Sequence, residues 1–138
     1  MTMKRIHLFI LTLFAAVLST TAVAEPAWLC SINDAVAVDG NGTVAPPDLD
    51  GKERPTFLRV DAETKTVTLL APESRRGEVT KIDAVQAHEG QWLFSGMEED
   101  RAWSLVITDE GRMTLSMVCD GAVWSIFGYT LAEEAADH

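Results

Sequence analysis

The sequence has little histidine, and this scarcity excludes several kinds of active site. Apart from His7 and His138 near the ends of the chain, His88 is the only histidine. Zinc sites that use two or three histidines therefore have no ligand set. A Ser-His-Asp triad would have to use His88, and no serine lies in a Gly-x-Ser-x-Gly elbow. We expect a non-enzymatic protein without a cofactor, with a hydrolase of unrecognised type as the remaining alternative.

Positive charge is also scarce, because 11 basic residues stand against 21 acidic ones and the net charge is −10. Such a chain repels nucleic acids and anionic membrane surfaces. It favours basic partners and solubility, and we expect no nucleic-acid partner.

Only one long apolar run is present, and it lies at the N-terminus. Lys4 and Arg5 precede the run from Ile6 to Val17, and the small residues Ala22-Val23-Ala24 follow it. This order is typical of a secretory signal peptide, and the run is shorter than the roughly 20 apolar residues of a membrane helix. We predict a signal peptide over 1–24, a mature chain that is periplasmic or secreted, and no membrane insertion. Cleavage would remove two basic residues and no acidic one, so the net charge would change from −10 to −12.

There are two cysteines, Cys30 and Cys119, and both lie in the expected mature chain. An even number of cysteines in an exported protein predicts a disulfide between them. Lipidation of Cys30 is the alternative, although bulky Trp28 and Leu29 precede the cysteine where a lipidation signal has a small residue.

Strand patterns dominate the rest of the chain, and no amphipathic helix is evident. Turn clusters recur at the spacing of roughly 8–12 residues that is typical of all-β folds. In one run Trp103, Leu105 and Ile107 alternate with polar or smaller residues, which is the pattern of a half-buried strand. The predicted strands are Trp28–Ile32, Ala35–Val38, Thr56–Val60, Thr66–Leu70, Glu78–Ala87, Trp92–Met97, Ala102–Thr108, Arg112–Cys119 and Ala122–Leu131.

Short turns between these strands predict a small all-β domain over 25–131, an antiparallel meander that closes into a β-barrel. A two-sheet sandwich is the alternative. The strand over 122–131 is apolar on both faces, so we expect it to be central in the sheet or covered on both sides. The segment 132–138 is expected to be a disordered acidic tail.

The segment from Asp39 to Pro55 is longer than the roughly 12–15 residues of ordinary loops, which indicates a functional loop. It contains Asp-Leu-Asp-Gly at 48–51, part of a calcium-loop pattern whose third acid and later glutamate are missing. We expect an ordinary Asp-Gly turn, with Asp39, Asn41, Asp48 and Asp50 as weak candidates for calcium ligands.

Four tryptophans lie in four different predicted strands. Large aromatic residues usually fill the core of a small barrel, but some can line a ligand cavity. The candidate cavity residues are Trp92, Trp103, Met113, Leu115 and Trp124.

These observations favour an exported, non-catalytic binding module of the cell envelope. Its barrel mouth or loops would bind a small apolar ligand or a protein. The strongly acidic composition supports one alternative, an inhibitor or accessory subunit that docks on a basic secreted enzyme.

Overall fold

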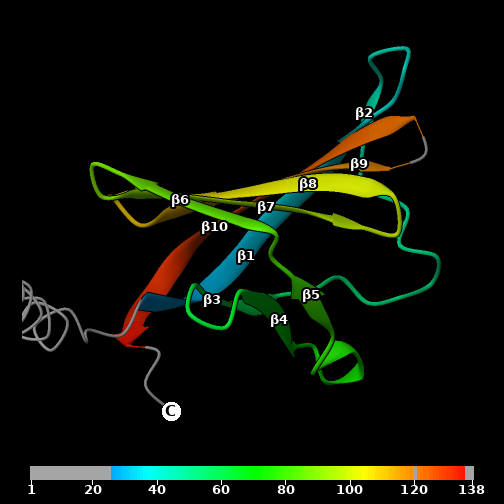
Figure 1. The fold of residues 1–138 in the computed structure, drawn as a ribbon. Coiled ribbons are helices and arrows are strands. Elements are labelled where there is room, and N and C mark those ends of the chain that lie inside the picture. Colours follow the sequence, from blue (N-terminus) through cyan, green and yellow to red (C-terminus); the bar gives the residue numbers. More distant parts are fainter. Residues whose placement is uncertain (1–25, 120, 136–138) are drawn as a thin grey trace, which may run out of the picture.

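The computed structural model describes residues 26–119 and 121–135, and the predicted signal peptide lies outside them. The described chain folds into strands of one antiparallel sheet (Figure 1). The strands are β1 (Pro26–Val38), β2 (Val44–Ala45), β3 (Phe57–Asp61), β4 (Thr66–Ala71), β5 (Val79–Lys81), β6 (Ala84–His88), β7 (Gln91–Glu98), β8 (Arg101–Ile107), β9 (Arg112–Cys119) and β10 (Ala122–Ala135), with a short 3-10 turn, η1 (Glu73–Arg75), after β4. The predicted all-β class is confirmed.

The central pair of the sheet joins the two ends of the described chain. The strand order is β5-β4-β3-β1-β10-β9-β8-β7-β6, and β2 pairs with β1 outside this path. One meander, β3 to β5, continues from β1, and the other runs from β6 to β10. The sheet curls so that these two arms face each other as a half-barrel (Figure 1). A two-sheet sandwich does not describe this arrangement, because all ten strands belong to one sheet.

The chain passes from one edge of the sheet to the other where β5 leads into β6, and the predicted closure into a full barrel is not confirmed. The amide of Ile82 donates a hydrogen bond to the Lys65 carbonyl oxygen beside β4, at 2.9 Å. The next amide, that of Asp83, donates to the Ser95 carbonyl oxygen in β7, at 2.8 Å. The chain therefore changes from one edge to the other within two residues. A single strand over 78–87 was predicted, and this change of partner divides it into β5 and β6.

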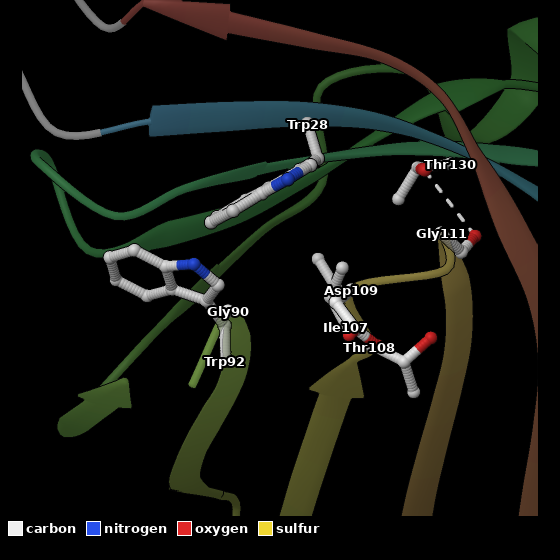
Figure 2. Close-up of a pocket in the computed structure, with 8 residues that line it drawn as sticks. All are labelled: Trp28, Gly90, Trp92, Ile107, Thr108, Asp109, Gly111 and Thr130. Carbon is white, nitrogen blue, oxygen red and sulfur yellow. Dashed lines mark hydrogen bonds between the residues drawn. The ribbon is translucent and has the colours of Figure 1, made fainter. Parts of the chain in front are cut away.

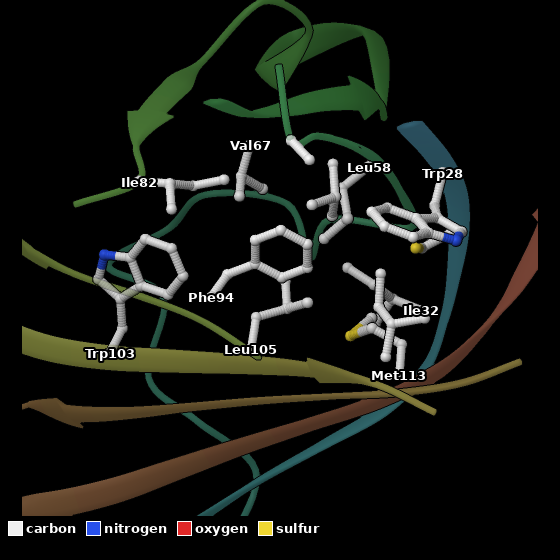
Figure 3. Close-up of a cluster of buried hydrophobic side chains, with 13 residues drawn as sticks. Trp28, Ile32, Leu58, Val67, Ile82, Phe94, Trp103, Leu105 and Met113 are labelled. Atoms are coloured by element: carbon white, nitrogen blue, oxygen red, sulfur yellow. The ribbon is translucent and has the colours of Figure 1, made fainter. Parts of the chain in front are cut away.

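The hydrophobic core lies between the two arms (Figure 3). Leu58 and Val67 point inward from β3 and β4, toward Phe94 and Leu105 from β7 and β8. Strand alternation explains this arrangement, since Trp103, Leu105 and Ile107 are all buried as expected from their period of two. The buried cluster comprises Trp28, Cys30, Ile32, Leu58, Val60, Ala62, Val67, Ile82, Phe94, Trp103, Leu105, Ile107 and Met113.

The predicted disulfide is not formed in this structure. Cys30 is a buried free thiol that lies opposite Thr130 of β10, whereas Cys119 lies opposite Ala122 of the same strand. Eight residues of β10 separate these two positions, which is roughly 26 Å at the usual strand rise. A disulfide needs Cα atoms within about 7 Å of each other. The prediction from cysteine number was therefore wrong, because strand register places the two cysteines toward opposite ends of β10.

Strand β10 departs from expectation in two further ways. Its inner face is partly buried, but Val123, Phe127, Tyr129 and Leu131 on the other face are 44–48% exposed. The strand is central in the sheet, which is one of the two alternatives expected for it, whereas coverage of both faces is not seen within the described chain. The strand also continues to Ala135 by pairing with the first residues of β1, so the segment expected to be a tail from residue 132 begins as strand.

Among the described residues, none forms a helix of the length and apolar character that a membrane crossing needs.

Candidate functional site

A cavity of about 320 Å³ lies at one end of the half-barrel, and we call it the mouth cavity. Strands β1, β3, β4, β9 and β10 form its floor. The loop between β2 and β3, turn η1 and the β7–β8 hairpin form its rim. The long loop that stood out in the sequence therefore borders the cavity.

Apolar side chains from neighbouring strands make the floor of the mouth cavity. Leu115 and Met117 of β9 lie directly opposite Ile126 and Trp124 of β10 in the antiparallel register. Since residues opposite one another in a ladder point to the same face, these cross-strand pairs present one continuous apolar surface. Leu58 of β3 closes the floor from the facing arm.

The rim of the mouth cavity is charged, and part of it is held by ion pairs. Arg75 donates two hydrogen bonds to the Glu78 carboxylate, at 2.9 and 3.2 Å. These bonds, and to a lesser extent the positive charges of Arg75 and Lys52, hold the pKa of Glu78 below its ordinary value against the opposing effect of desolvation. Glu98 accepts a hydrogen bond of 2.6 Å from the Thr80 hydroxyl.

Hydrogen bonds hold the loop between β2 and β3 to β1 on one side and to η1 on the other. Arg54 donates to the Asn33 carbonyl oxygen in β1 at 3.3 Å, and the Glu53 carboxylate accepts from Ser74 in η1 at 3.0 Å. Arg75 also donates to the Glu53 carbonyl oxygen, at 3.2 Å. The rim therefore keeps a defined position relative to the floor.

The weak calcium candidates serve as turn residues. The Asp39 Oδ1 atom accepts from the amides of Asn41 and Thr43, both at 2.9 Å, and Asp48 accepts from the amide of Asp50 at 3.0 Å. Asp48 and Asp50 line the mouth cavity, whereas the turn of Asp39 and Asn41 does not. Among the side chains that the structure describes, those of residues 26–118 and 121–131, no group of three His, Cys, Asp or Glu could hold a metal ion.

A smaller pocket of about 190 Å³ lies elsewhere on the half-barrel (Figure 2). Trp28 and Trp92 line it on one side, edge to face with ring centroids 5.1 Å apart, and Ile107 lies across from them. Thr130 donates to the Gly111 carbonyl oxygen at 3.3 Å beside it. Its volume is below the range of about 300–1,000 Å³ that is usual for small-molecule sites.

The five predicted cavity residues do not lie together. Leu115 and Trp124 line the mouth cavity, and Trp92 lines the smaller pocket. Trp103 and Met113 are buried in the core, with 4% and 1% of their surfaces exposed. Sequence reasoning missed the rim residues Arg75 and Arg101, and the one available signal for this region was the length of the loop.

His88 is the last residue of β6, next to the turn that leads into β7, and 88% of its side chain is exposed. Its Nε2 atom is 3.8 Å from a carboxylate oxygen of Glu89, which is also exposed. Acid–base catalysis by histidine needs a sheltered partner and substrate position, and this turn offers neither.

Comparison of the chain with models of known protein families, with curated proteins and with solved structures found no match.

Proposed function

We propose that the protein is an exported, non-catalytic binding module that holds a small, largely apolar ligand in the mouth cavity. The observation that carries this proposal is the cavity itself, about 320 Å³ in volume, with an apolar floor and a charged rim. Ligand sites typically have this composition, in which apolar surface provides affinity and a few polar groups fix orientation. Export is inferred from the N-terminal sequence alone.

The carboxylates of the described chain whose pKa values are lowered support binding more than turnover. Catalytic groups usually have pKa values tuned by burial in a sheltered pocket. The two carboxylates of the described chain with lowered pKa values, Asp61 and Glu78, are instead held by hydrogen bonds from neighbouring arginines and, for Asp61, from backbone amides. Such groups remain ionised and stabilise the loops around them.

The neutral dye N-phenylnaphthylamine tests this function, because its fluorescence rises in an apolar site. We expect saturable binding to the mature protein. Leu115→Trp should abolish this binding because the larger side chain fills the floor of the mouth cavity. The matched control is Leu93→Trp on the outer face of β7, where Leu93 is 38% exposed. Unsaturable binding, or equal binding by the two variants, would contradict the proposal.

The exposed face of β10 supports a second candidate function, docking on a basic protein. Val123, Phe127, Tyr129 and Leu131 form an apolar row, and Val118 of β9 lies opposite Val123 and is 52% exposed. Exposed apolar patches of this kind often mark protein interfaces. The acidic character of the chain favours a cationic partner.

A purified partner of this kind should bind more weakly as salt concentration increases and should lose binding to a Phe127→Ser variant. Leu93→Ser, on the outer face of β7, is the control. Equal loss with both variants would contradict docking through β10.

A further inference from the structure

A large share of the basic residues of this acidic protein line the mouth cavity. Of the nine basic residues that follow the predicted signal peptide, Lys52, Arg54, Arg75 and Arg101 line the cavity. Five acidic residues, Asp48, Asp50, Glu78, Glu98 and Glu99, line it too. Which charge the cavity would bind in a ligand therefore depends on which of these groups already have a partner and which are partly buried.

Three charged side chains of the rim are partly buried, namely those of Arg75, Glu98 and Arg101. Arg75 is paired with Glu78. Glu98, opposite Arg101 in the β7–β8 ladder, accepts a hydrogen bond from the neutral Thr80 hydroxyl. Arg54 lies 3.8 Å from Asp34 as well as bonding to the Asn33 carbonyl. Lys52, Asp48, Asp50 and Glu99 are exposed, so water screens their charges.

Arg101 is the exception. It is partly buried, and its guanidinium group has no hydrogen-bond or ion-pair partner among the side chains and backbone that the structure describes in full, residues 26–118 and 121–131. It begins β8, and the alternation of that strand places it on the same face as Trp103 and Leu105, which are buried in the core. The positive charge therefore belongs to the inner face of the half-barrel, next to the apolar floor of the mouth cavity.

An unpaired cation beside an apolar surface is a favourable partner for an anionic group. The attraction between opposite charges is stronger where water is partly excluded than at an exposed surface. Arginine also binds carboxylates with two parallel hydrogen bonds, which fixes the orientation of the ligand.

We propose that the ligand of the mouth cavity is an amphiphile with a carboxylate head and a hydrocarbon body, of the fatty-acid type. The carboxylate pairs with Arg101, and the hydrocarbon packs on Leu115, Trp124 and Ile126. This inference rests on the proposed ligand-binding function of the same cavity. It adds the chemical class of the ligand and the residue that selects it.

Calorimetric titration with octanoate, octanol and octylamine tests the proposal, because the three compounds share a hydrocarbon chain and differ in the charge of the head group. At neutral pH and low salt, octanoate should bind about tenfold more tightly than octanol, and octylamine should bind most weakly. Arg101→Gln should remove the preference for octanoate, and Arg101→Lys should retain most of it. Arg112→Gln, the same change at the first residue of the neighbouring strand outside the cavity, should have no effect.

The two proposals fail in different ways. If none of the three compounds binds the wild-type protein, ligand binding in the mouth cavity is contradicted, and the carboxylate proposal fails with it. If octanol binds as tightly as octanoate, or octylamine binds most tightly, ligand binding stands and the carboxylate proposal is overturned. If the Arg101→Gln variant does not fold, the head-group series on the wild-type and Arg101→Lys proteins still decides between these outcomes.

Discussion

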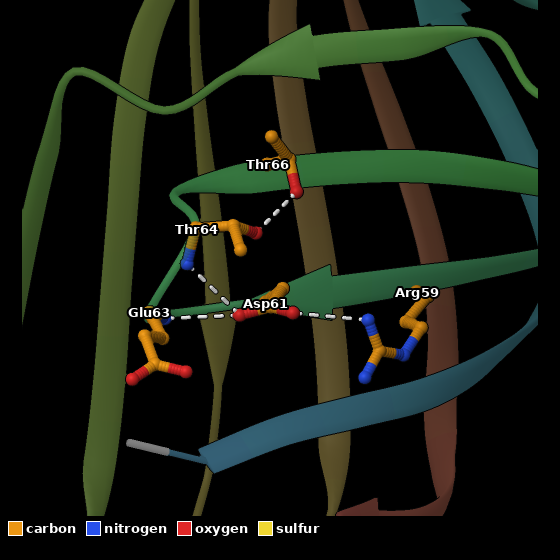
Figure 4. A network of polar contacts seen from close by, with 5 residues as sticks. All are labelled: Arg59, Asp61, Glu63, Thr64 and Thr66. Atoms are coloured by element: carbon orange, nitrogen blue, oxygen red, sulfur yellow. Dashed lines mark hydrogen bonds and ion pairs between the residues drawn. The ribbon is translucent and has the colours of Figure 1, made fainter. Parts of the chain in front are cut away.

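Asp61 is a buried carboxylate that organises the turn between β3 and β4 (Figure 4). Burial acts to raise its pKa. The amides of Thr64 and Glu63 and the guanidinium of Arg59, at 3.1, 3.0 and 3.0 Å, outweigh burial and hold the pKa below its ordinary value. Asp61→Ala would leave these donors without their acceptor. We expect it to lower the free energy of unfolding by about 1–3 kcal/mol in chemical denaturation.

The same carboxylate predicts a dependence of stability on pH. A group whose pKa is lower in the folded state stabilises the protein above its unfolded pKa, about 3.9 for aspartate. This contribution is lost as pH falls through that value and below the folded pKa. Wild-type stability should therefore fall more steeply below about pH 4 than that of Asp61→Asn. Parallel denaturation curves for the two proteins at acidic pH would contradict the role assigned to Asp61.

Cys30 should behave as an inaccessible thiol. Burial raises its pKa to about 12, so almost none of it is the reactive thiolate at neutral pH. We expect alkylating reagents to modify Cys30 only after denaturation, as mapped by peptide mass spectrometry. Reductant should not change the melting temperature. Recovery of a peptide in which Cys30 is linked to Cys119 would contradict the register of β1 and β10.

At the scale of elements, Gly128 allows β10 to pass close to β1. The register of β1 shifts between Ile32 and Asp34, and a Cβ atom on Gly128 would collide with the Ser31 carbonyl oxygen. Gly128→Ala therefore requires the backbone itself to move. We expect a loss of about 3 kcal/mol or failure to fold, measured by thermal and chemical denaturation.

Gly40→Ala is the matched control, because no atom lies within 4 Å of the added Cβ and Gly40 does not need a positive φ. A similar loss of stability in both variants would show that the close approach of β1 and β10 is not the cause.

The positions of the strands were largely predictable from the sequence, because alternation and turn residues are local signals. Trp103, Leu105 and Ile107 were assigned to one face from their spacing, and all three are buried. The pairing of β1 with β10 and the change of edge at Ile82 depend on contacts between distant segments. Local patterns carry no information about those contacts, and the wrong cysteine pairing has the same origin.

The candidate site was less predictable than the strands. Alternation along a strand identifies which side chains face inward, but it does not show where along the length of the half-barrel each side chain lies. Trp92, Met113 and Trp124 were therefore grouped together, although they lie in the smaller pocket, the core and the mouth cavity respectively. Arg101 was missed because its importance depends on the absence of a partner in the described chain, which only the three-dimensional arrangement reveals.

For the whole molecule, we expect export with removal of the first 24 residues. Protein recovered from the periplasm or medium should begin at Glu25, as measured by N-terminal sequencing. Replacing Leu11 and Leu13 with arginine should block processing, because it interrupts the apolar run that an export signal requires. The same changes are expected to leave a longer species in the cytoplasm. A wild-type protein that stays in the cytoplasm with its N-terminus intact would contradict export.

The pairing of β1 with β10 also determines when the fold can be completed. Pro26 lies opposite Ala135, so 109 positions separate the partners at this end of the ladder. A chain that emerges N-terminus first holds β1 without its central neighbour until β10 has appeared. Folds dominated by such distant contacts form slowly, because a long loop must close before the contacts stabilise it. The order of synthesis therefore leaves the central pairing of β1 with β10 unformed during elongation, in a state that an export channel for unfolded chains could accept.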